Sequence, residues 1–496
     1  MWTDYIPHFT LAAGLDMLAI AIAIPWVLMT KKESTSAVAW CLLVLLVPLF
    51  GVLLFWVFGH NHISRPLRRK RLHRVLFRAA HPAGPASGPG ERADAPLSAS
   101  TGRLTPAAHP PLTAAFDDLG QLALRVNAFP IRNGNAVTWY HDTQQAFDAL
   151  LQAIRGARRH VHLQYFIFRP DAAGRQLLEL LTQKAKEGVE VRLLYDAMGG
   201  RTLGRRFLRP LEQAGGKVGV FLPLNPLRSR IQINLRNHRK ITIIDGQVAF
   251  TGGMNIGDEY LGRNAYFGYW RDEVLRLEGP AVADLQRIFV EDWDFARHEV
   301  LVHDAYFPPP NEVGDAVVQV AESGPDQEIN TIREIYFAAI VAARERLWIA
   351  SPYFVPDAGL LDALRLARYR GVDVRLLSLL RPDHYLSFYA GRYYWSDMLA
   401  VGVKVYQYAK GMMHSKLVMV DGRWAMAGSA NLDNRSLRLN FEAVCLMHSP
   451  HVIAELERAY LDDLDDSILL DAVTFSRRSF GVRLVENGCR LLSPIL

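Results

Sequence analysis

The sequence predicts an α/β protein in which two similar halves, each a β-sheet flanked by helices, are related by a pseudo-twofold axis and follow a two-helix transmembrane hairpin. Three observations lead to this prediction. Two long apolar stretches lie near the N-terminus, a strand-helix-strand pattern occurs twice in the remaining chain, and the same polar motif follows each copy. The chain therefore combines a membrane anchor with a duplicated globular part.

The composition places the excess of positive charge and of apolar residues at one end of the chain. Of the 496 residues, 50% are hydrophobic and 21% are charged, which excludes the disordered and fibrous classes. The mean hydropathy is +0.04 and the net charge is +6. Residues 1–78 hold nine Lys or Arg against three acidic residues, and the other 418 residues hold 47 of each sign. Such a distribution is typical of a membrane edge.

Residues 1–63 are expected to form two transmembrane helices, at about residues 9–29 and 37–58. Each stretch has the ~20 residues needed to cross the hydrocarbon core, and the second contains no charged residue. A cleaved signal peptide is not expected, because residues 1–8 contain no Lys or Arg. Residues 65–78 contain seven basic residues and no acid, so the positive-inside rule places both ends of the hairpin in the cytoplasm.

Residues 64–112 are expected to be a basic flank followed by a linker rich in Pro, Gly and Ala. The basic run is either solvated or in contact with anionic headgroups. The globular part divides into a first half, 113–310, and a second half, 311–496. In each half a β-rich segment, residues 161–168 or 347–355, precedes Leu residues at helical spacing and then the buried strand GVEVRLL or GVDVRLL.

Each half contains one copy of the motif H-x-K-x4-D-x6-G-[GS]-x-N, in which the run after Lys reads ITII or LVMV. The polar residues of the two copies are His238, Lys240, Asp245, Gly253 and Asn255, and His414, Lys416, Asp421, Ser429 and Asn431. His and Lys lie two residues apart, so on an extended chain their side chains share one face. An imidazole can attack phosphorus or donate a proton near neutral pH, while a Lys ammonium and an Asn amide neutralise charge on phosphoryl oxygens. The motifs therefore predict one phosphoryl-transfer site built from both halves.

This pair of motifs resembles the HKD motifs of the phospholipase D superfamily, and the whole arrangement resembles its bacterial cardiolipin synthases over essentially the entire chain. The resemblance implies two phospholipase D-like halves and a ping-pong reaction through phosphohistidine, with no metal and no cofactor. His238 is expected to be the nucleophile and His414 the acid and base, in a nearly symmetric arrangement. The residues expected to hold the phosphoryl oxygens are Lys240, Lys416, Asn255, Asn431, Gly253 and Ser429. Asp245 and Asp421 are expected to orient a His or a Lys.

The resemblance also implies the substrate and the location. Two molecules of phosphatidylglycerol would give cardiolipin and glycerol, so the expected partners are phosphatidylglycerol, other anionic phospholipids and the bilayer. The expected location is the bacterial inner membrane, with the catalytic part in the cytoplasm. A charge-balanced catalytic part disfavours nucleic acid as a partner. The alternatives left open are a phospholipase D that yields phosphatidic acid, a nuclease or other phosphodiesterase, and a non-catalytic membrane scaffold. The oligomeric state is left open too, with a homo-oligomer as one alternative.

Other polar residues are expected to lie outside the chemistry or to support it. His160 and His162 are expected to be structural or exposed, and the acidic run 462–466 a solvated helix face. Free thiols are expected at Cys41, Cys445 and Cys489. Support of the site is expected from Asp258, Glu259, Tyr260, Asn440 and Glu442, while Tyr165 and Tyr353 either belong to the core or line the site. The segment 480–496 is expected either to lie on the membrane or to pack onto the fold.

Overall fold

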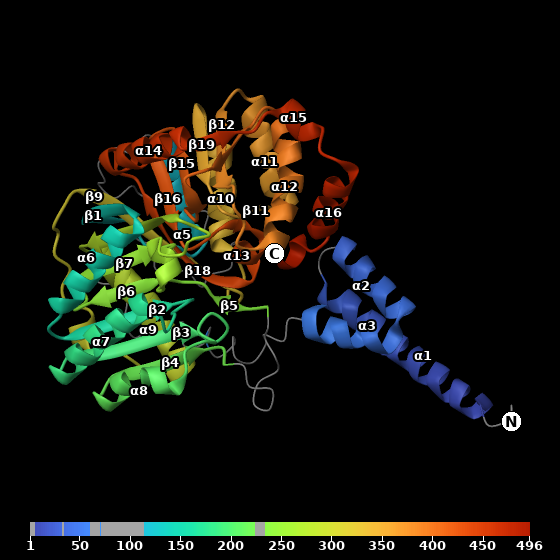
Figure 1. Cartoon of the computed structure of the whole chain (residues 1–496), viewed down its shortest axis with the longest axis horizontal. Coiled ribbons are helices and arrows are strands. Elements are labelled where there is room, and N and C mark those ends of the chain that lie inside the picture. Colours follow the sequence, from blue (N-terminus) through green and yellow to red (C-terminus); the bar gives the residue numbers. More distant parts are fainter. Residues whose placement is uncertain (1–4, 32–33, 60–69, 71–113, 224–233) are drawn as a thin grey trace, which may run out of the picture. The chain divides into compact units, whose positions relative to one another are not determined.

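The computed structural model describes residues 5–31, 34–59, 70, 114–223 and 234–496 (Figure 1). The chain separates into two compact units. The first comprises residues 1–68 with 223–234, and the second comprises residues 69–222 with 235–496. Both halves of the globular part thus belong to one unit.

Among the described residues, the N-terminal unit has one helix that is long and apolar enough to cross a membrane, judged by length and composition. Its elements are α1 (Tyr5–Thr30), α2 (Ser34–Leu46), α3 (Pro48–Leu54) and the π-helical turn η1 (Phe55–Gly59). The apolar window of α1 is Ala13–Thr30. Within the unit, buried Val27, Ala37 and Phe55 pack together with the partly buried Trp26 and Trp40.

The second apolar stretch differs from the predicted single helix over residues 37–58. The helix ends at Leu46 and begins again at Pro48, and Val47 between them has φ −140° and ψ 76°. Proline lacks a backbone N–H and disfavours the helical conformation in the residue before it, which explains the break. The 13 residues of α2 reach about 20 Å, less than the ~30 Å hydrocarbon core.

The second unit is a long mixed sheet flanked by helices (Figure 1). Strands of the first half are β1 (Arg132–Asp142), β2 (His160–Tyr165), β3 (Glu190–Asp196), β4 (Lys217–Phe221), β5 (Arg236–Asn237), β6 (Ile241–Ile244), β7 (Val248–Gly252) and β8 (Tyr269–Glu278). Strands of the second half are β9 (Ala316–Ser323), β10 (Arg346–Ala350), β11 (Phe354–Val355), β12 (Asp373–Leu379), β13 (Lys404–Tyr408), β14 (Gly411–Met413), β15 (Leu417–Val420), β16 (Trp424–Gly428), β17 (Leu432–Asp433), β18 (Asn440–Met447) and β19 (Ser467–Leu469).

The helices of this unit alternate with the strands, as an α/β fold requires. In the first half they are α5 (Ala114–Arg125), α6 (Thr143–Arg155), α7 (Ala172–Lys186), α8 (Arg205–Gln213), the 3-10 helix η3 (Asp258–Leu261), α9 (Ala281–Arg297) and η4 (Asp304–Tyr306). In the second half they are α10 (Thr331–Ala342), α11 (Ala358–Tyr369), α12 (Tyr385–Ala400), α13 (Asn434–Arg438), α14 (Pro450–Asp465), α15 (Ala472–Ser476), α16 (Phe480–Arg490) and η5 (Ser493–Ile495).

One series of neighbouring strands runs through both halves. Its order is β4-β3-β2-β6-β7-β8-β1-β9-β18-β16-β15-β10-β12-β13-β19. Strands β2, β3 and β4 are parallel, as are β10, β12 and β13, and the other pairs of the series are antiparallel. Apart from the added edge strand β19, reversing the order about the β1–β9 pair exchanges the two halves. The duplication predicted from the sequence is therefore present in the strand order.

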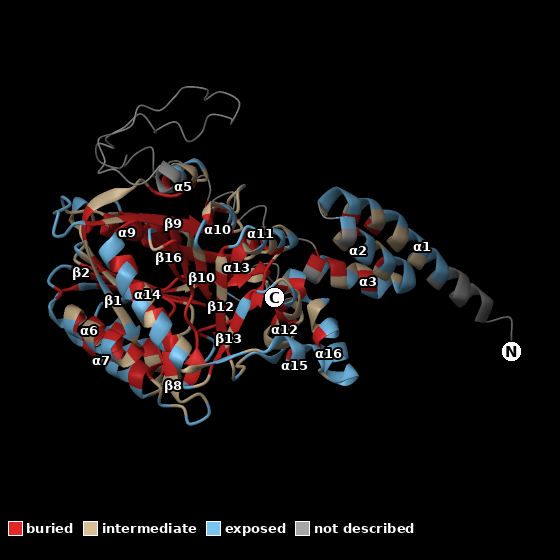
Figure 2. Cartoon of the chain, turned by 90° about the horizontal axis from the view of Figure 1, so that it is seen from above, coloured by how far each residue is buried: buried red, intermediate tan, exposed pale blue. Residues whose placement is uncertain are grey.

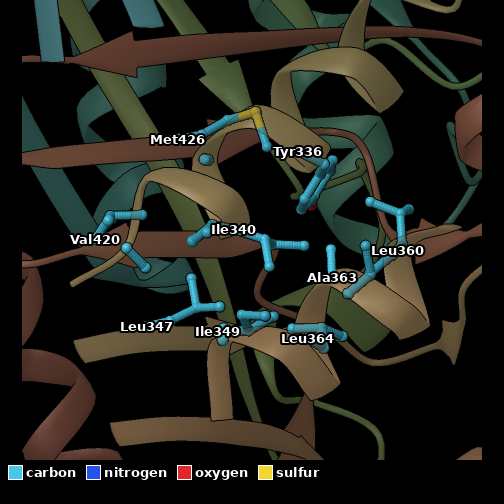
Figure 3. Packing of buried hydrophobic residues seen from close by; sticks show 14 of the residues in the cluster. Tyr336, Ile340, Leu347, Ile349, Leu360, Ala363, Leu364, Val420 and Met426 are labelled. Carbon is cyan, nitrogen blue, oxygen red and sulfur yellow. The ribbon is translucent and has the colours of Figure 1, made fainter. Parts of the chain in front are cut away.

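The core lies between the sheet and the helices that cover it. Figure 2 shows buried residues concentrated on the central strands and exposed residues on the outer helices. In the second half, Tyr336 and Ile340 of α10 and Leu364 of α11 belong to one apolar cluster with Ile349 of β10 (Figure 3). The predicted buried runs ITII and LVMV are confirmed as β6 and β15, whose residues are all buried.

Candidate active site

Two short strands carry the motif histidines onto the opposite half of the molecule. β5 pairs in parallel with β18, and the backbone N–H of His238 donates to the carbonyl of Phe441 at 2.9 Å. β14 pairs in parallel with β8, and the N–H of His414 donates to the carbonyl of Arg271 at 2.8 Å. Each histidine therefore belongs to one half and is held by the last long strand of the other.

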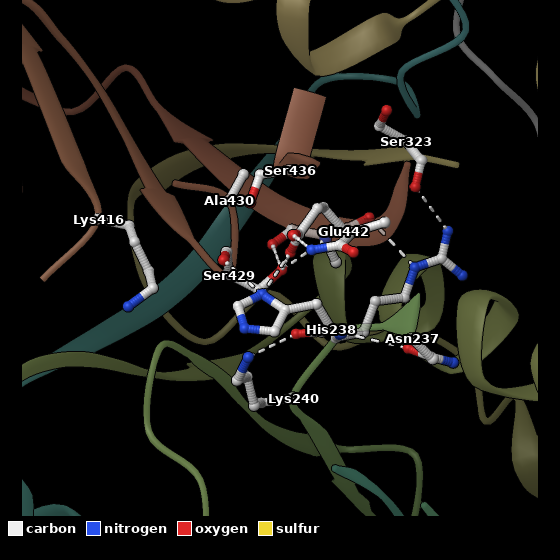
Figure 4. Close-up of polar contacts among 12 residues, drawn as sticks. Asn237, His238, Lys240, Ser323, Lys416, Ser429, Ala430, Ser436 and Glu442 are labelled. Carbon is white, nitrogen blue, oxygen red and sulfur yellow. Dashed lines mark hydrogen bonds and ion pairs between the residues drawn. The ribbon is translucent and has the colours of Figure 1, made fainter. Parts of the chain in front are cut away.

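The His238 ring is oriented by two acceptors from the second half (Figure 4). Its Nδ1 lies 3.1 Å from Glu442 Oε2 and 3.1 Å from the carbonyl oxygen of Ser429. A carbonyl oxygen accepts only, so Nδ1 carries the proton and Nε2 keeps its lone pair. Burial lowers the pKa of His238 to about 4, although the charge of Glu442 opposes this shift. The ring is therefore neutral near pH 7, and its Nε2 keeps a lone pair.

Glu442 is itself fixed as an ionised acceptor. The Ser429 hydroxyl donates to Glu442 Oε2 at 2.5 Å, and Asn440 Nδ2 donates to its other oxygen at 3.1 Å. Burial pushes the pKa of Glu442 upward, but His238 and Lys240 outweigh burial, and the pKa falls below its ordinary value. The prediction that Asn440 and Glu442 support the site agrees with these contacts.

His414 has the equivalent partner on the first half. Its Nδ1 lies 2.6 Å from Asp272 Oδ2, and Asp272 Oδ1 accepts the N–H of Glu273 at 2.8 Å. Burial and the charge of Lys416 lower the pKa of His414, and Asp272 opposes them. Burial pushes the pKa of Asp272 upward, but Lys416 and His414 outweigh it, so that carboxyl stays ionised.

The motif lysines lie beside the histidines with which they share a motif. Lys240 Nζ donates to the carbonyl of His238 at 2.7 Å, and Lys416 Nζ donates to the carbonyl of His414. Burial lowers the pKa of Lys240 to about 7, and Lys416 adds to the decrease while Glu442 opposes it. The charge of Lys416 also acts on His238, so the two motifs form one electrostatic site.

The Gly and Ser at the matching motif positions contact the carboxylates. A Cβ on Gly253 would collide with Asp272 Oδ1, so glycine leaves the space that the partner of His414 occupies. Ser429 instead bonds Glu442. Asn255 Oδ1 accepts the N–H of Ile167 at 3.1 Å. The predicted phosphate contacts of these residues stay predictions.

The prediction that Asp245 and Asp421 orient a His or a Lys is wrong. The carboxylate of Asp245 accepts the backbone N–H groups of residues 158, 159 and 160 at 2.7–2.9 Å. Asp421 does the same for residues 344, 345 and 346 at 2.8–2.9 Å. A four-residue buried strand separates each Asp from its Lys, which carries the carboxylate about 13 Å or more away from the chemistry. Both residues cap the start of a central strand.

The sequence reasoning missed Asp272. It follows Trp270 and Arg271 on β8, the strand after the first motif, as Glu442 follows Asn440 and Phe441 on β18. An acid near the start of the strand after each motif was the available signal. The acid reaches the histidine of the other half because β14 pairs with β8 and β5 pairs with β18. No local sequence pattern predicts these pairings.

A buried ion network lies behind the first motif. Arg239 pairs with Asp292 at 2.7 Å and with Glu322 at 2.5 Å. Lys70 Nζ lies 2.6 Å from Asp292 Oδ1 and 4.3 Å from the ring centroid of Phe441. Lys70 is the one described residue of the predicted basic flank. It is buried in the second compact unit, here called the catalytic unit, and is neither solvated nor in contact with lipid headgroups. A carboxylate and an aromatic face supply the partners that a buried ammonium needs.

The other polar candidates have structural roles. His160 and His162 are both buried, and His162 Nδ1 lies 3.2 Å from Gln286 Oε1. The prediction of a solvated face for the acidic run is wrong at Asp463, which is buried and bonds Arg271 at 2.8 Å. Among the described residues, no group of three or more His, Cys, Asp or Glu is arranged to hold a metal ion.

The remaining predictions concern the thiols, the tyrosines and the C-terminal segment. Cys41, Cys445 and Cys489 are free. The Tyr165 hydroxyl lies 3.0 Å from Thr242 Oγ1, and the Tyr353 hydroxyl donates to Asp383. The carboxylate of Glu486, on α16, accepts from Arg392 of α12 at 2.8 Å, so this part of the segment packs onto the fold.

Comparisons with known proteins identify the family of the chain. Residues 150–293 and 336–464 match the family described as "Cardiolipin synthase, PLD-like domain", and residues 17–60 match "Phospholipase_D-nuclease N-terminal". A cardiolipin synthase of Geobacillus kaustophilus is 38% identical over 494 residues, which covers 98% of this chain and 94% of the relative. A cardiolipin synthase of Staphylococcus aureus is 36% identical over 485 residues, which covers 97% and 96%.

A solved structure extends the comparison to the fold. The phosphatidylserine synthase of Haemophilus influenzae Rd KW20 has a TM-score of 0.61 at 16% identity, covering 77% of this chain and 99% of that chain. At this identity the likeness shows the fold alone. The family match on both halves and the relatives along nearly the whole chain show that this protein belongs to the cardiolipin synthases of the phospholipase D-like superfamily, which places it among the phosphatidyltransferases.

Proposed function

We propose that this enzyme transfers the phosphatidyl group of one phosphatidylglycerol to another, releasing glycerol and forming cardiolipin through a phosphohistidine. The observation that carries the proposal is the pair of histidines whose Nδ1 atoms face carboxylates from the opposite half. This arrangement leaves two Nε2 atoms for reaction at one phosphorus.

In the first step, His238 Nε2 attacks the phosphorus of the donor. The bond between phosphorus and the glycerol oxygen breaks, and His414 gives its Nε2 proton to that oxygen. The neutral, Nδ1-protonated state of His238 supports its role as nucleophile. Burial and Lys416 lower the pKa of His414, so its imidazolium form depends on the 2.6 Å contact with Asp272 and on the bound phosphodiester anion, which both favour that form.

In the second step, His414 acts as the base. It takes the proton from the terminal hydroxyl of a second phosphatidylglycerol, whose oxygen attacks the phosphohistidine and frees His238. Lys240 and Lys416 neutralise charge on the phosphoryl oxygens in both steps, with Asn255 and Asn431 as expected donors. One phosphodiester replaces another, so the reaction needs no nucleotide.

We also propose that the apolar stretch 37–58 crosses the bacterial inner membrane as α2 and α3 together, despite the break at Val47. The stretch contains no charge, and Pro is tolerated in membrane helices. The basic residues at 65–78 support a hairpin with both ends in the cytoplasm. Cysteine-accessibility labelling in intact cells at the loop between the stretches tests this, because a periplasmic loop reacts with a membrane-impermeant thiol reagent and a cytoplasmic loop does not.

The function is tested with the purified full chain in phosphatidylglycerol vesicles without nucleotide. We expect cardiolipin and free glycerol in equal amounts, whereas phosphatidic acid without cardiolipin contradicts the proposal. His238→Ala and His414→Ala should each abolish turnover, and near-normal turnover by either contradicts the two-histidine scheme. His451→Ala, at an exposed histidine, is the matched control and should be unaffected.

A phosphatidyl donor whose leaving group needs no general acid distinguishes the roles of the two histidines. With a phosphatidyl ester of p-nitrophenol, His414→Ala should still release nitrophenol in a burst, because the leaving group needs no proton. His238→Ala should not release it. The reverse pattern exchanges the assigned roles.

A further inference from the structure

Asp383 lies at the edge of the active site in the loop between β12 and α12. The parallel strands β10, β12 and β13 end at this edge, where ligands bind in α/β sheets. The Tyr353 hydroxyl donates to Asp383 Oδ2 at 2.5 Å. The other oxygen, Oδ1, is buried and has no hydrogen-bond partner among the described residues. One oxygen of this carboxylate is therefore held by Tyr353, while the other oxygen is available to accept a hydrogen bond from a ligand.

The charge of Asp383 reaches the reacting groups. It raises the pKa of both His414 and Lys416, against the larger effect of burial. Aromatic side chains bound the same region, since the ring centroid of Trp270 lies 5.3 Å from that of His414 and 4.8 Å from that of Tyr260. Asp383 is thus close enough to His414, Lys416 and Tyr260 for its charge to act on all three.

The loop is fixed to both halves of the catalytic unit. Arg381 donates to the carbonyl of Tyr266, in the first half, at 3.1 Å. On the other side, Ser351 Oγ donates to the carbonyl of Tyr353 at 2.7 Å and accepts the N–H of Leu432 at 3.1 Å, next to Asn431. Asp383 is therefore positioned by the frame that holds the second motif.

A buried carboxylate oxygen without a donor is costly, so this position favours a ligand that donates a hydrogen bond. The groups facing Asp383 are Tyr353, Tyr260 and His384, with the charges of Lys416 and His414 nearby. The positive charge of Lys416 disfavours a second cation such as an ammonium headgroup. A neutral hydroxyl fits both conditions.

We propose that Asp383, held by Tyr353, binds a second hydroxyl of the alcohol that leaves or attacks at His414. This inference rests on the proposed function, in which that alcohol is glycerol or the glycerol headgroup. The hydroxyl at Asp383 only donates a hydrogen bond, while the neighbouring hydroxyl forms or breaks its bond to phosphorus and exchanges its proton with His414. Asp383 selects a vicinal diol over water and over simple alcohols as the acceptor.

The test measures acceptor choice by the full chain in phosphatidylglycerol vesicles containing labelled glycerol or 1-propanol. For Asp383→Asn we expect the ratio of cardiolipin to phosphatidic acid, and of labelled phosphatidylglycerol to phosphatidylpropanol, to fall about 10-fold or more. Tyr353→Phe should change both ratios in the same direction, because it releases the carboxylate. Asp362→Asn, at an exposed carboxylate on α11, is the control and should leave both ratios unchanged.

Other outcomes overturn the inference. One such outcome is that Asp383→Asn slows the formation of all products equally, shifts the pH profile and leaves both ratios constant. Asp383 then acts through His414 and binds no hydroxyl. If added ethanolamine rather than glycerol loses reactivity, the site takes an ammonium group. If the wild-type enzyme makes no cardiolipin, the proposed function fails, whereas constant ratios in a cardiolipin-forming enzyme refute only the role of Asp383. Melting curves verify that each variant is folded.

Discussion

Glu442 Oε2 lies 3.1 Å from Nδ1 of His238, although the two residues come from different halves of the chain. The reciprocal contact joins Asp272 of the first half to His414 of the second at 2.6 Å. Each histidine is thus oriented by the other half, and neither half alone holds a motif histidine together with its carboxylate. Because each histidine contacts a carboxylate of the other half, we expect activity only when both halves are folded together.

Replacing Glu442 by Gln should lower kcat strongly without unfolding the enzyme. The Ser429 carbonyl still holds the proton on Nδ1 in this variant, but the neutral amide no longer stabilises the positive charge that forms on the His238 ring when Nε2 bonds phosphorus. We expect a loss of about 10²-fold to 10⁴-fold, by analogy with carboxylate-to-amide changes beside catalytic histidines. The rate of cardiolipin formation measures the loss. Glu345→Gln, at an exposed carboxylate, is the control, and equal rates for both variants would contradict the role of Glu442.

The pH dependence of kcat/KM should have a basic limb set by Lys240. Burial lowers the pKa of Lys240 to about 7, so raising the pH through this value removes the positive charge that faces the phosphoryl oxygens. In Lys240→Arg the guanidinium stays protonated, and the limb should move to higher pH even though the changed geometry lowers the rate. Lys217→Arg, at a half-exposed lysine, should keep the wild-type profile. An unmoved limb in Lys240→Arg assigns it to another group.

Replacing Asp245 by Asn should affect stability more than chemistry. The carboxylate accepts three backbone N–H groups at the start of β2, and the amide oxygen accepts them less strongly because it carries no charge. We expect the free energy of unfolding to fall by about 1–3 kcal/mol, seen as a lower melting temperature, with the activity of the folded enzyme within a few-fold of wild type. A large loss of kcat in a fully stable variant would restore a catalytic role for Asp245.

Replacing Lys70 by Met should destabilise the catalytic unit. The ammonium lies 2.6 Å from Asp292 and 4.3 Å from the Phe441 ring, and Met keeps the apolar stem but removes the charge. Asp292 retains Arg239 at 2.7 Å, so we expect a moderate loss of about 1–3 kcal/mol, measured as melting temperature of the full chain in detergent. Lys217→Met is the surface control. Equal melting temperatures for Lys70→Met and wild type would show that Lys70 contributes nothing to this network.

The sequence predicted the periodic and repeated features of this chain. The strands ITII and LVMV, the helices at α7 and α11 and the duplicated order follow from apolar spacing and repetition, which are local properties. The prediction of a single helix over residues 37–58 was wrong at Pro48. The effect of Pro48 on Val47 is local as well, so the sequence contained the signal for this break. The predicted role of Asp245 was wrong for a different reason, because its partners are three backbone N–H groups some 85 residues away in the sequence.

By itself the sequence determined the two α/β halves, the paired His and Lys motifs and the membership of a phosphatidyltransferase family. Only the tertiary structure decided which carboxylate faces which histidine and that Lys70 is buried beside Asp292. It also showed that one oxygen of Asp383 has no hydrogen-bond partner in the part of the chain that the structure describes. The physical reason is that a motif fixes which groups are available along one strand. Their tautomers, charges and partners depend on strands and loops that folding brings from the other half.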